Sequence, residues 1–328
     1  MNPLAPIEEI MRRHDSTCTV EEFHTVVNVV FHEFEAEIYD VVHRDMWESL
    51  PAQVSLLASD CLHSGAIAGD LRLLDVGCGT GLASDCVLKS PLGPKVASVH
   101  LLDMSPTMLR KAQSRAGNWN IPVTSNEGTV ETLRAEQQFD LIVTCSVLHH
   151  IPDLAAFLRN IRQVQAPDGV FIHLQDPNGD YLKDEELQKR TAELSKTIFP
   201  EWISRLAPKR VLGRVYREIT GKQGQDYVSR TNRELLRRGV VQSPLTTKEI
   251  FSITDIHVQD GAGISIRRMM EWMPDYELIS QRAYAFFGRL ASTLPPEWKS
   301  REEELSAQRA LNGMHISAAW RLSHPGTF

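Results

Sequence analysis

The chain has no long apolar run and only a few cysteines. No stretch of 18 apolar residues occurs among its 328 residues, and residues 1–16 lack the apolar segment of a secretion signal. We therefore expect a cytoplasmic protein without a membrane partner. The five cysteines include no C-x-x-C pair and leave an odd one, which argues against a disulfide framework and against a structural zinc site.

The chain also lacks an excess of positive charge. Its formal net charge of -7 argues against DNA as a partner, because phosphates require a basic surface. Residues 183–238 are an exception, with 14 Lys and Arg against 8 Asp and Glu. This local excess has two interpretations: a helical insertion with solvated faces, or a substrate lid whose arginines meet an anionic acceptor.

A glycine-rich turn is the most informative stretch of the chain. A buried strand is predicted over 71–76, and Gly77, Gly79 and Gly81 follow it at alternate positions. Because glycine has no Cβ, the backbone there can turn tightly and approach a ligand closely. The turn leads into an expected helix over 82–89, whose first N–H groups face the same place. This arrangement indicates a nucleoside-binding turn.

The spacing of the glycines selects the nucleoside. A dinucleotide-binding turn needs the pattern G-x-G-x-x-G, whereas this chain has G-x-G-x-G and Leu82 at the position of the third glycine. Asp75 stands two residues before the first glycine, where its charge would repel a pyrophosphate but suits an ammonium group. S-adenosylmethionine has an ammonium group, a sulfonium and no phosphate, so the turn favours this cofactor.

Two further motifs follow the glycine turn in order. Residues 99–109, with Asp103, and residues 139–153 each have the pattern of a strand followed by a turn. With Asp75-x-Gly-x-Gly-x-Gly81 they resemble class I S-adenosylmethionine-dependent methyltransferases of the ubiquinone-biosynthesis type. The resemblance implies an α/β fold: a doubly wound, Rossmann-like sheet of seven mostly parallel strands, with an N-terminal helical lid and a helical insertion after strand five.

Alternating strand and helix patterns between residues 71 and 177 predict a parallel sheet with right-handed crossovers. The expected strands are 71–76, 97–102, 121–125, 139–145 and 169–175, and the expected helices are 82–89, 106–115, 128–135 and 153–165. The family resemblance adds a sixth strand over 276–286 and an antiparallel seventh strand over 314–322.

Helical periodicity predicts further helices outside this region. They are 19–50, ended by Pro51, then 54–62, 183–198, 200–218, 226–238, 265–272 and 297–311, and a capping box from Thr246 to Glu249 begins another. We therefore divide the chain into four parts. They are a helical lid at 1–70, a cofactor-binding core at 71–177, a helical insertion and substrate lid at 178–262, and C-terminal strands at 263–328 that complete the sheet.

The resemblance also implies a set of cofactor contacts. Asp103 would accept both ribose hydroxyls, and Met104 would pack on the adenine. Thr129, followed by Val130, replaces an acid that the family often has against adenine, which leaves that contact to backbone N–H groups or removes it. The methionine moiety would lie among the residues of the first motif: Asp75, Gly77, Cys78, Gly79 and Gly81.

Three cofactor contacts have alternatives. Cys145 and Ser146 end the fourth strand, where a main-chain carbonyl meets the cofactor ammonium in the family, but Cys145 equally fits a small core residue. Tyr39, with Asp40, resembles a Tyr-Asp pair of the family's lid helices. It either contacts the cofactor or covers the core.

The catalytic residues are less clearly marked than the cofactor site. Methyl transfer requires an aligned nucleophile, and a general base is needed only when that nucleophile carries a proton. His149 and His150 follow the fourth strand, and His257 precedes a glycine-rich loop, so these three are the candidate bases, with packing or surface roles as alternatives. No metal is expected, because Cys145 and Ser146 offer no hard anionic oxygen where a magnesium-dependent enzyme would need one.

These motifs predict an enzyme that moves a methyl group from S-adenosylmethionine to an O or N atom of a small-molecule acceptor, such as a specialised metabolite. One alternative is a non-catalytic binding or regulatory protein with the same fold, which the threonine at 129 keeps open. Another is a protein- or RNA-directed methyltransferase that uses the basic insertion. The sequence leaves a homo-oligomer open.

Overall fold

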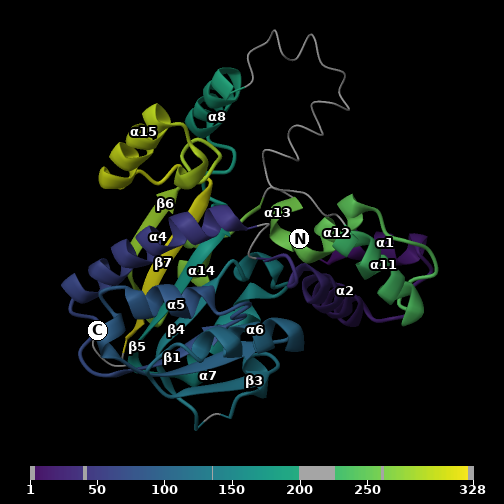
Figure 1. Ribbon diagram of the computed structural model, residues 1–328, viewed down its shortest axis with the longest axis horizontal. Coiled ribbons are helices and arrows are strands. Elements are labelled where there is room, and N and C mark those ends of the chain that lie inside the picture. Colours follow the sequence, from purple (N-terminus) through teal and green to yellow (C-terminus); the bar gives the residue numbers. More distant parts are fainter. Residues whose placement is uncertain (1–3, 40–42, 135, 199–225, 260–261, 324–328) are drawn as a thin grey trace.

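The computed structural model describes residues 4–39, 43–134, 136–198, 226–259 and 262–323 (Figure 1). The expected helix over 200–218 lies outside these residues, as does Asp40 of the Tyr-Asp pair. No helix in the described part of the chain combines the length and the apolar character that crossing a membrane requires.

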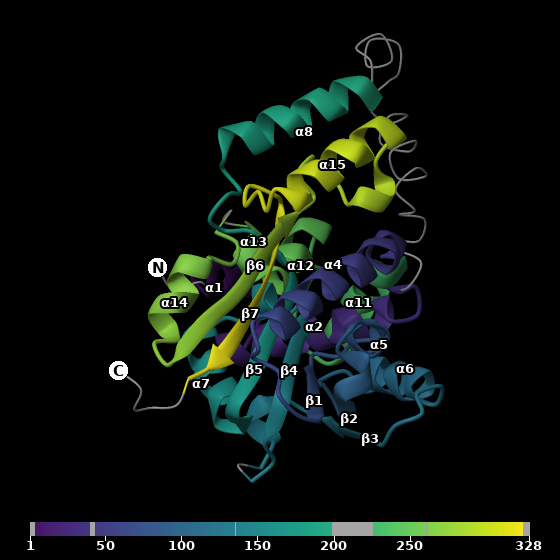
Figure 2. The same cartoon turned by 90° about the vertical axis from the view of Figure 1, so that its left-hand side faces the viewer.

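A single seven-stranded sheet forms the centre of the molecule, as the fold prediction required (Figures 1 and 2). Its strands are β1 (Leu71–Val76), β2 (Val96–Asp103), β3 (Val123–Glu127), β4 (Phe139–Cys145), β5 (Gln165–Pro177), β6 (Tyr276–Tyr284) and β7 (His315–Leu322). Their order is β3-β2-β1-β4-β5-β7-β6. β7 is antiparallel to both of its neighbours, and the first five strands are parallel. This confirms the doubly wound, mostly parallel architecture.

Hydrophobic side chains cover both faces of the sheet. In β1, Leu73 joins the cluster beneath α4 (Arg44–His63), α5 (Leu82–Lys89) and α6 (Pro106–Ala116). Leu74 points the other way, into the cluster beneath α7 (Leu154–Val164), α14 (Ile266–Trp272) and α15 (Pro296–Ala307). Strands buried on both faces carry continuous apolar runs, which is why these strands could be predicted from the sequence.

Two helix predictions were wrong. The expected helix over 19–50 is not continuous: in the described residues α2 (Val20–Glu35) ends before α4 begins, and Pro51 lies inside α4 instead of ending it. Pro51 is on the exposed side of α4, where water can reach the carbonyl that loses its N–H partner. Within the described part of 128–135 there is only a 3₁₀ turn, Val130–Thr132, because Gly128 has a φ of 142° that no helix tolerates.

Helices from distant parts of the chain form one layer beside the sheet, which we call the cap (Figure 1). It consists of α1 (Ala5–Arg13), α2, α11 (Asp226–Arg237), α12 (Thr247–Thr254) and α13 (Ile256–Gln259). Phe23, Val27 and Phe31 of α2 pack against Leu235 and Ile253 in a cluster of their own. By contrast α4 packs across β6 and β7, and α8 (Glu185–Ile198) lies near α15 (Figure 2).

A buried ion pair joins α4 to the far edge of the sheet. The Asp60 carboxylate accepts from Arg282 at 2.6 and 2.8 Å and from the Ser280 hydroxyl at 2.6 Å. The side chains of Asp60 and Arg282 are only 11% and 12% exposed, so neither charge can be hydrated fully if the other is removed.

We expect Asp60→Ala to lower the free energy of unfolding by about 2 kcal/mol, since it strands a mostly buried guanidinium. Glu48→Ala is the matched control, because Glu48 pairs with Arg44 on the exposed side of the same helix and should cost less than about 0.5 kcal/mol. Urea unfolding followed by circular dichroism measures both. Equal losses in the two variants would contradict the role given to Asp60.

Candidate functional site

The three glycines of the turn have positive φ angles but different surroundings. A Cβ at Gly77 would lie 2.7 Å from a methyl group of Val147, and one at Gly81 would lie 3.3 Å from Ala112. At Gly79 a Cβ would meet no atom within 4 Å. Gly77 and Gly81 are therefore needed for packing, whereas Gly79 leaves its backbone open to a ligand.

Asp75 is fully buried at the end of β1. Its Oδ2 accepts from the Ser84 hydroxyl at 2.6 Å and from the Ser84 N–H at 3.1 Å, while its Oδ1 has no hydrogen-bond partner among the described residues. Burial raises the pKa of Asp75 to about 6, against the two bonds from Ser84 and with help from the nearby charge of Asp103. An unpartnered carboxylate oxygen in this position suits a cationic ligand group.

Asp103 joins the glycine turn to the end of β2. Its two oxygens accept from the N–H groups of Gly79 and Ser105, each at 2.8 Å, and burial raises the pKa of the carboxyl group. The next side chain, Met104, is 38% exposed. A fixed carboxylate beside an exposed apolar side chain fits a ribose and the base attached to it.

The other predicted cofactor residues, apart from Tyr39, lie at or just after the ends of β1, β3 and β4. The loop of Thr129 and Val130 is tied to β2, because the Gly128 N–H donates to the Asp103 carbonyl at 3.0 Å. Ser146 has a φ of 58° and donates its N–H to the Leu174 carbonyl at 2.7 Å. The remaining three are placed as follows: Cys78 is buried in the turn, Cys145 is partly buried against the core, and the Tyr39 ring lies 4.4 Å from that of His43.

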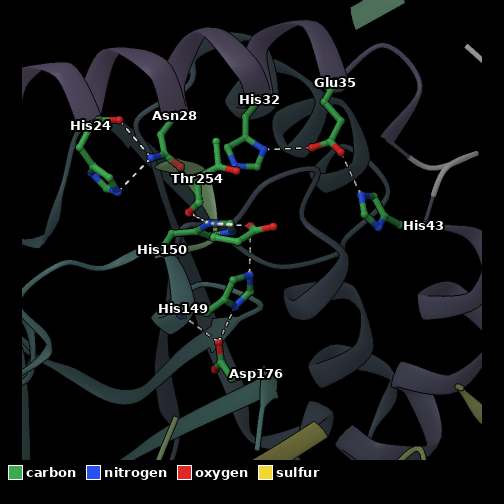
Figure 3. A network of polar contacts seen from close by, with 10 residues as sticks. His24, Asn28, His32, Glu35, His43, His149, His150, Asp176 and Thr254 are labelled. Atoms are coloured by element: carbon green, nitrogen blue, oxygen red, sulfur yellow. Dashed lines mark hydrogen bonds and ion pairs between the residues drawn. The ribbon is translucent and has the colours of Figure 1, made fainter. Parts of the chain in front are cut away.

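A cluster of histidines lies where the cap meets the core (Figure 3). His149, in the 3₁₀ turn Leu148–His150, donates from Nδ1 to the fully buried Asp176 at 3.0 Å. Burial would raise the pKa of Asp176, but the hydrogen bond from His149 and the ring of His173, whose Nδ1 lies 3.4 Å from the carboxylate, keep this pKa low. Because a carboxylate can only accept, the proton of a neutral His149 ring sits on Nδ1 and the lone pair on Nε2.

His150 and His257 are bound to main-chain carbonyls instead. His150 donates from Nδ1 to Thr254 at 2.6 Å, and His257 donates from Nε2 to Ile151 at 2.7 Å, so both bonds fasten the cap to the core. Burial lowers the pKa of His150 well below its usual value, and the neighbouring His149 adds to the effect. With its pKa held this low by burial, His150 is a weak base.

Ligand atoms of His149, His150 and Asp255 come within 4.8 Å of one another. Asp255 Oδ1 is 3.9 Å from His149 Nε2 and 3.5 Å from His150 Nδ1. His150 Nδ1 carries the proton that bonds the Thr254 carbonyl, so it cannot act as a ligand without breaking that bond. In this arrangement the three groups form a close cluster of acidic and basic side chains.

Sequence reasoning missed several members of the cluster. His32 and Glu35 come from α2, His43 from the residue before α4, and Asp255 from the junction of α12 and α13. The one local signal was the spacing of His32 and Glu35, which places them on one face of the same helix. Asp176 lies in β5, and its bond to His149 depends on strand order.

Comparison with known proteins identifies the core. A family described as "Methyltransferase domain" matches residues 74–171, the segment that carries all three motifs. The core belongs to the class I S-adenosylmethionine-dependent methyltransferases. This confirms the family prediction.

Relatives of known name match the methyltransferase core over part of their length. The ubiquinone biosynthesis O-methyltransferase of Methylobacterium sp. (strain 4-46) is 36% identical over 119 residues, which are 34% of this chain and 45% of that protein. The enzyme of the same name from Xanthomonas campestris pv. campestris (strain B100) is 27% identical over 187 residues, 55% of this chain and 72% of that protein. The chain thus spans less than half the length of the Methylobacterium relative.

Among solved structures, the plantazolicin methyltransferase BpumL in complex with SAH is 11% identical, with a TM-score of 0.47 over 93% of this chain and 97% of that one.

The methyltransferase turn allows a controlled test of ligand approach. We expect Gly79→Ala to weaken the binding of S-adenosylhomocysteine at least tenfold, because the new methyl group enters the space that Gly79 leaves open. Gly65→Ala is the matched control: Gly65 has a similar positive φ of 71° and an equally open Cβ position, but lies before β1. Calorimetry should show that Gly65→Ala binds S-adenosylhomocysteine with the affinity of the wild type. Equal affinities of all three proteins would contradict the placement of the ligand.

Proposed function

We propose that this chain binds S-adenosylmethionine and transfers its methyl group to an O or N atom of a small-molecule acceptor, as a cytoplasmic enzyme without a DNA or membrane partner. The observation that carries the proposal is the Asp103 carboxylate, fixed by the N–H groups of Gly79 and Ser105 in a methyltransferase domain. That carboxylate is where the family's ribose acceptor is expected.

In the proposed complex each cofactor group meets a suitable side chain. Asp103 takes the ribose hydroxyls, Met104 covers the adenine, and the buried charge of Asp75, whose Oδ1 has no hydrogen-bond partner, attracts the ammonium group. The following residues complete the site as proposed contacts: Tyr39, Gly77, Cys78, Gly79, Gly81, Thr129, Val130, Cys145 and Ser146.

Of the three candidate bases, we propose His149 for the proton transfer. S-adenosylmethionine supplies a methyl group that is already activated by the sulfonium, so the protein has only to align the acceptor and take up its proton. Asp176 holds the Nδ1–H of His149, leaves Nε2 free to accept a proton, and stabilises the imidazolium that results. The proposal gives His150 and His257 the role of holding the cap.

The proposed acceptor is small because the cap stands over the strand ends and is fastened to the core beside the cluster. The relatives' printed name, ubiquinone biosynthesis O-methyltransferase, supports a small acceptor of this kind. We propose that the cap is the substrate lid.

A labelling experiment tests the function directly. Purified protein and S-adenosylmethionine with a radioactive methyl group are incubated with a cell extract, which is then separated into small molecules, protein and RNA. The proposal expects label in the small-molecule fraction. Label in protein or RNA would identify the acceptor as a macromolecule, and no transfer would identify a non-catalytic protein; either result would overturn the proposal.

We expect His149→Ala to lower turnover by about a hundredfold or more while the affinity for S-adenosylhomocysteine stays unchanged, because it removes the base and not a cofactor contact. His63→Ala, on the exposed end of α4, is the control that should keep full activity. Turnover is followed with the acceptor fraction found above. Full activity of His149→Ala would remove this histidine from the mechanism.

The buried carboxylate at 75 predicts that cofactor binding depends on pH. Because the pKa of Asp75 is raised to about 6, the group takes up a proton as the pH falls below that value, and the cofactor ammonium then loses its counter-charge. We expect the dissociation constant of S-adenosylhomocysteine to rise about tenfold between pH 7.5 and pH 5. We expect Asp75→Asn to bind S-adenosylhomocysteine weakly at both pH values. The small change in affinity that remains between them would come from Asp103. Equal affinity of the wild type at both pH values would contradict the assignment of Asp75 to the ammonium group.

A further inference from the structure

Asp176 has a second histidine neighbour besides His149. Figure 3 shows Asp176 below His149, whose N–H and Nδ1 donate to Oδ1 at 3.3 and 3.0 Å. His173, three residues earlier in β5, places its Nδ1 3.4 Å from the other oxygen, Oδ2. The side chains of Asp176 and His173 are 0% exposed, so bulk water cannot reach either of them. One imidazole therefore faces each oxygen of the buried carboxylate.

A bulge in β5 brings His173 and Asp176 to the same side of the sheet. Side chains alternate along a regular strand, so residues three apart would point to opposite faces. Between His173 and Asp176 the pairing of β5 with β7 shifts register, and Gln175 has a φ of 63°, which is uncommon for a residue with a Cβ. The Tyr284 hydroxyl donates to Oε1 of the buried Gln175 at 2.8 Å. A strained bulge held in this way makes the position of Asp176 a candidate for function.

His173 and the second oxygen of Asp176 depend on each other. In the described part of the chain, neither nitrogen of His173 makes a full hydrogen bond, and neither does Oδ2 of Asp176. Since Asp176 has a low pKa and an ionised carboxylate can only accept, the proton of a neutral His173 ring belongs on Nδ1. A buried polar group without a partner costs free energy, so the 3.4 Å contact holds both groups in place.

A third imidazole lies near Asp176 but brings no positive charge. Burial lowers the pKa of His315, in β7, to about 4, and His149 adds to this effect while Asp176 opposes it. His315 is therefore neutral at ordinary pH, and its Nδ1 makes no hydrogen bond among the described residues. His149 and His173 are then the imidazoles whose N–H groups face the carboxylate.

We propose that His173 is a positioning residue for the methyl transfer. By holding Oδ2 of Asp176, it keeps Oδ1 on Nδ1 of His149, so that the lone pair of His149 stays on Nε2. Without His173 the carboxylate is free to turn about its Cβ–Cγ bond, and His149 can then carry its proton on Nε2, the tautomer that accepts no proton there. This inference rests on the proposed function, in which His149 is the base.

The tautomer of His149 is a readout that a merely structural role of His173 would not change. Protonated and unprotonated imidazole nitrogens have separate ¹⁵N resonances. Nuclear magnetic resonance of the full chain with ¹⁵N-labelled histidines therefore measures the tautomer at about pH 8.5, where ordinary imidazoles are neutral. We expect the wild type to show the Nδ1–H tautomer at both His149 and His173. In His173→Leu the ratio of Nδ1–H to Nε2–H tautomer at His149 should fall about fivefold.

Two further variants separate positioning from packing. His173→Asn places an amide N–H close to where Nδ1 lies, and we expect it to keep the wild-type tautomer at His149. His100→Leu is the matched control, because His100 is also a buried histidine of the sheet, 5% exposed, but contacts the Thr124 hydroxyl instead of Asp176. We expect the wild-type tautomer there too. Turnover with the labelled acceptor fraction should fall about tenfold in His173→Leu and stay within about twofold of the wild type in the other two variants.

An unchanged tautomer of His149 in His173→Leu would overturn the inference, and so would a change of the same size in His100→Leu or in His173→Asn. The wild type gives a second measurement, which holds even if His173→Leu does not fold. An Nε2–H tautomer at His173 in the wild type would leave no proton between this ring and Asp176, and the inference would be wrong.

The same proteins separate this inference from the proposed function. Calorimetry with S-adenosylhomocysteine should give one affinity for the wild type and all three variants, because none of the changed residues is a proposed cofactor contact. If His149→Ala keeps full turnover, the proposed base is wrong, whereas the spectra still show whether His173 holds Asp176. If His149→Ala is inactive and the spectra do not change in His173→Leu, the base stands and His173 has no part in positioning it.

Discussion

The hydrogen bond from the Gly79 N–H to the Asp103 carboxylate is the contact on which the site depends. It continues the parallel pairing of β1 and β2, since the Cys78 N–H already donates to the Leu102 carbonyl at 3.0 Å. The turn is thereby held against the end of β2, with the two acids Asp75 and Asp103 close enough for the charge of one to raise the pKa of the other. A buried carboxylate with one unpartnered oxygen and a half-buried carboxylate beside it favour a ligand that brings a cation and hydroxyl groups.

Hydrophobic packing and hydrogen bonds from histidines hold the cap in its position. α2 packs against α11 and α12 through a cluster separate from those of the sheet. Its connection to the core runs through polar bonds, among them His150 to the Thr254 carbonyl and His257 to the Ile151 carbonyl. Such bonds are directional, so they fix the height of the cap over the strand ends and with it the place of His32. The same cluster of histidines therefore holds the cap against the core.

Local patterns predicted much of the fold. β1, β4 and α5 have the expected bounds, because neighbouring residues determine where a buried strand or a helix that follows a glycine begins and ends. The antiparallel last strand was also confirmed, although only the family resemblance indicated it. Pro51 was misjudged because its effect depends on which side of α4 it faces, and this is fixed by packing on the sheet.

The histidine cluster was predictable only in part. His149 and His150 follow a strand that the motif identified, but their partners are Asp176, 27 residues on from His149, and Thr254, 104 residues on from His150. The bond of His32 to Glu35 is local, yet its meaning comes from the cap, which joins segments that lie about 200 residues apart. A single sequence shows the residue types of such a site and not which of them meet.

A crystal structure of the chain with S-adenosylhomocysteine tests the central claim most directly. The account predicts ribose hydroxyls within hydrogen-bonding distance of the Asp103 carboxylate, the backbone of Gly79 against the ligand, and the amino group on the side of Asp75. A ligand bound elsewhere, or a nicotinamide dinucleotide bound at the glycine turn in its place, would contradict it.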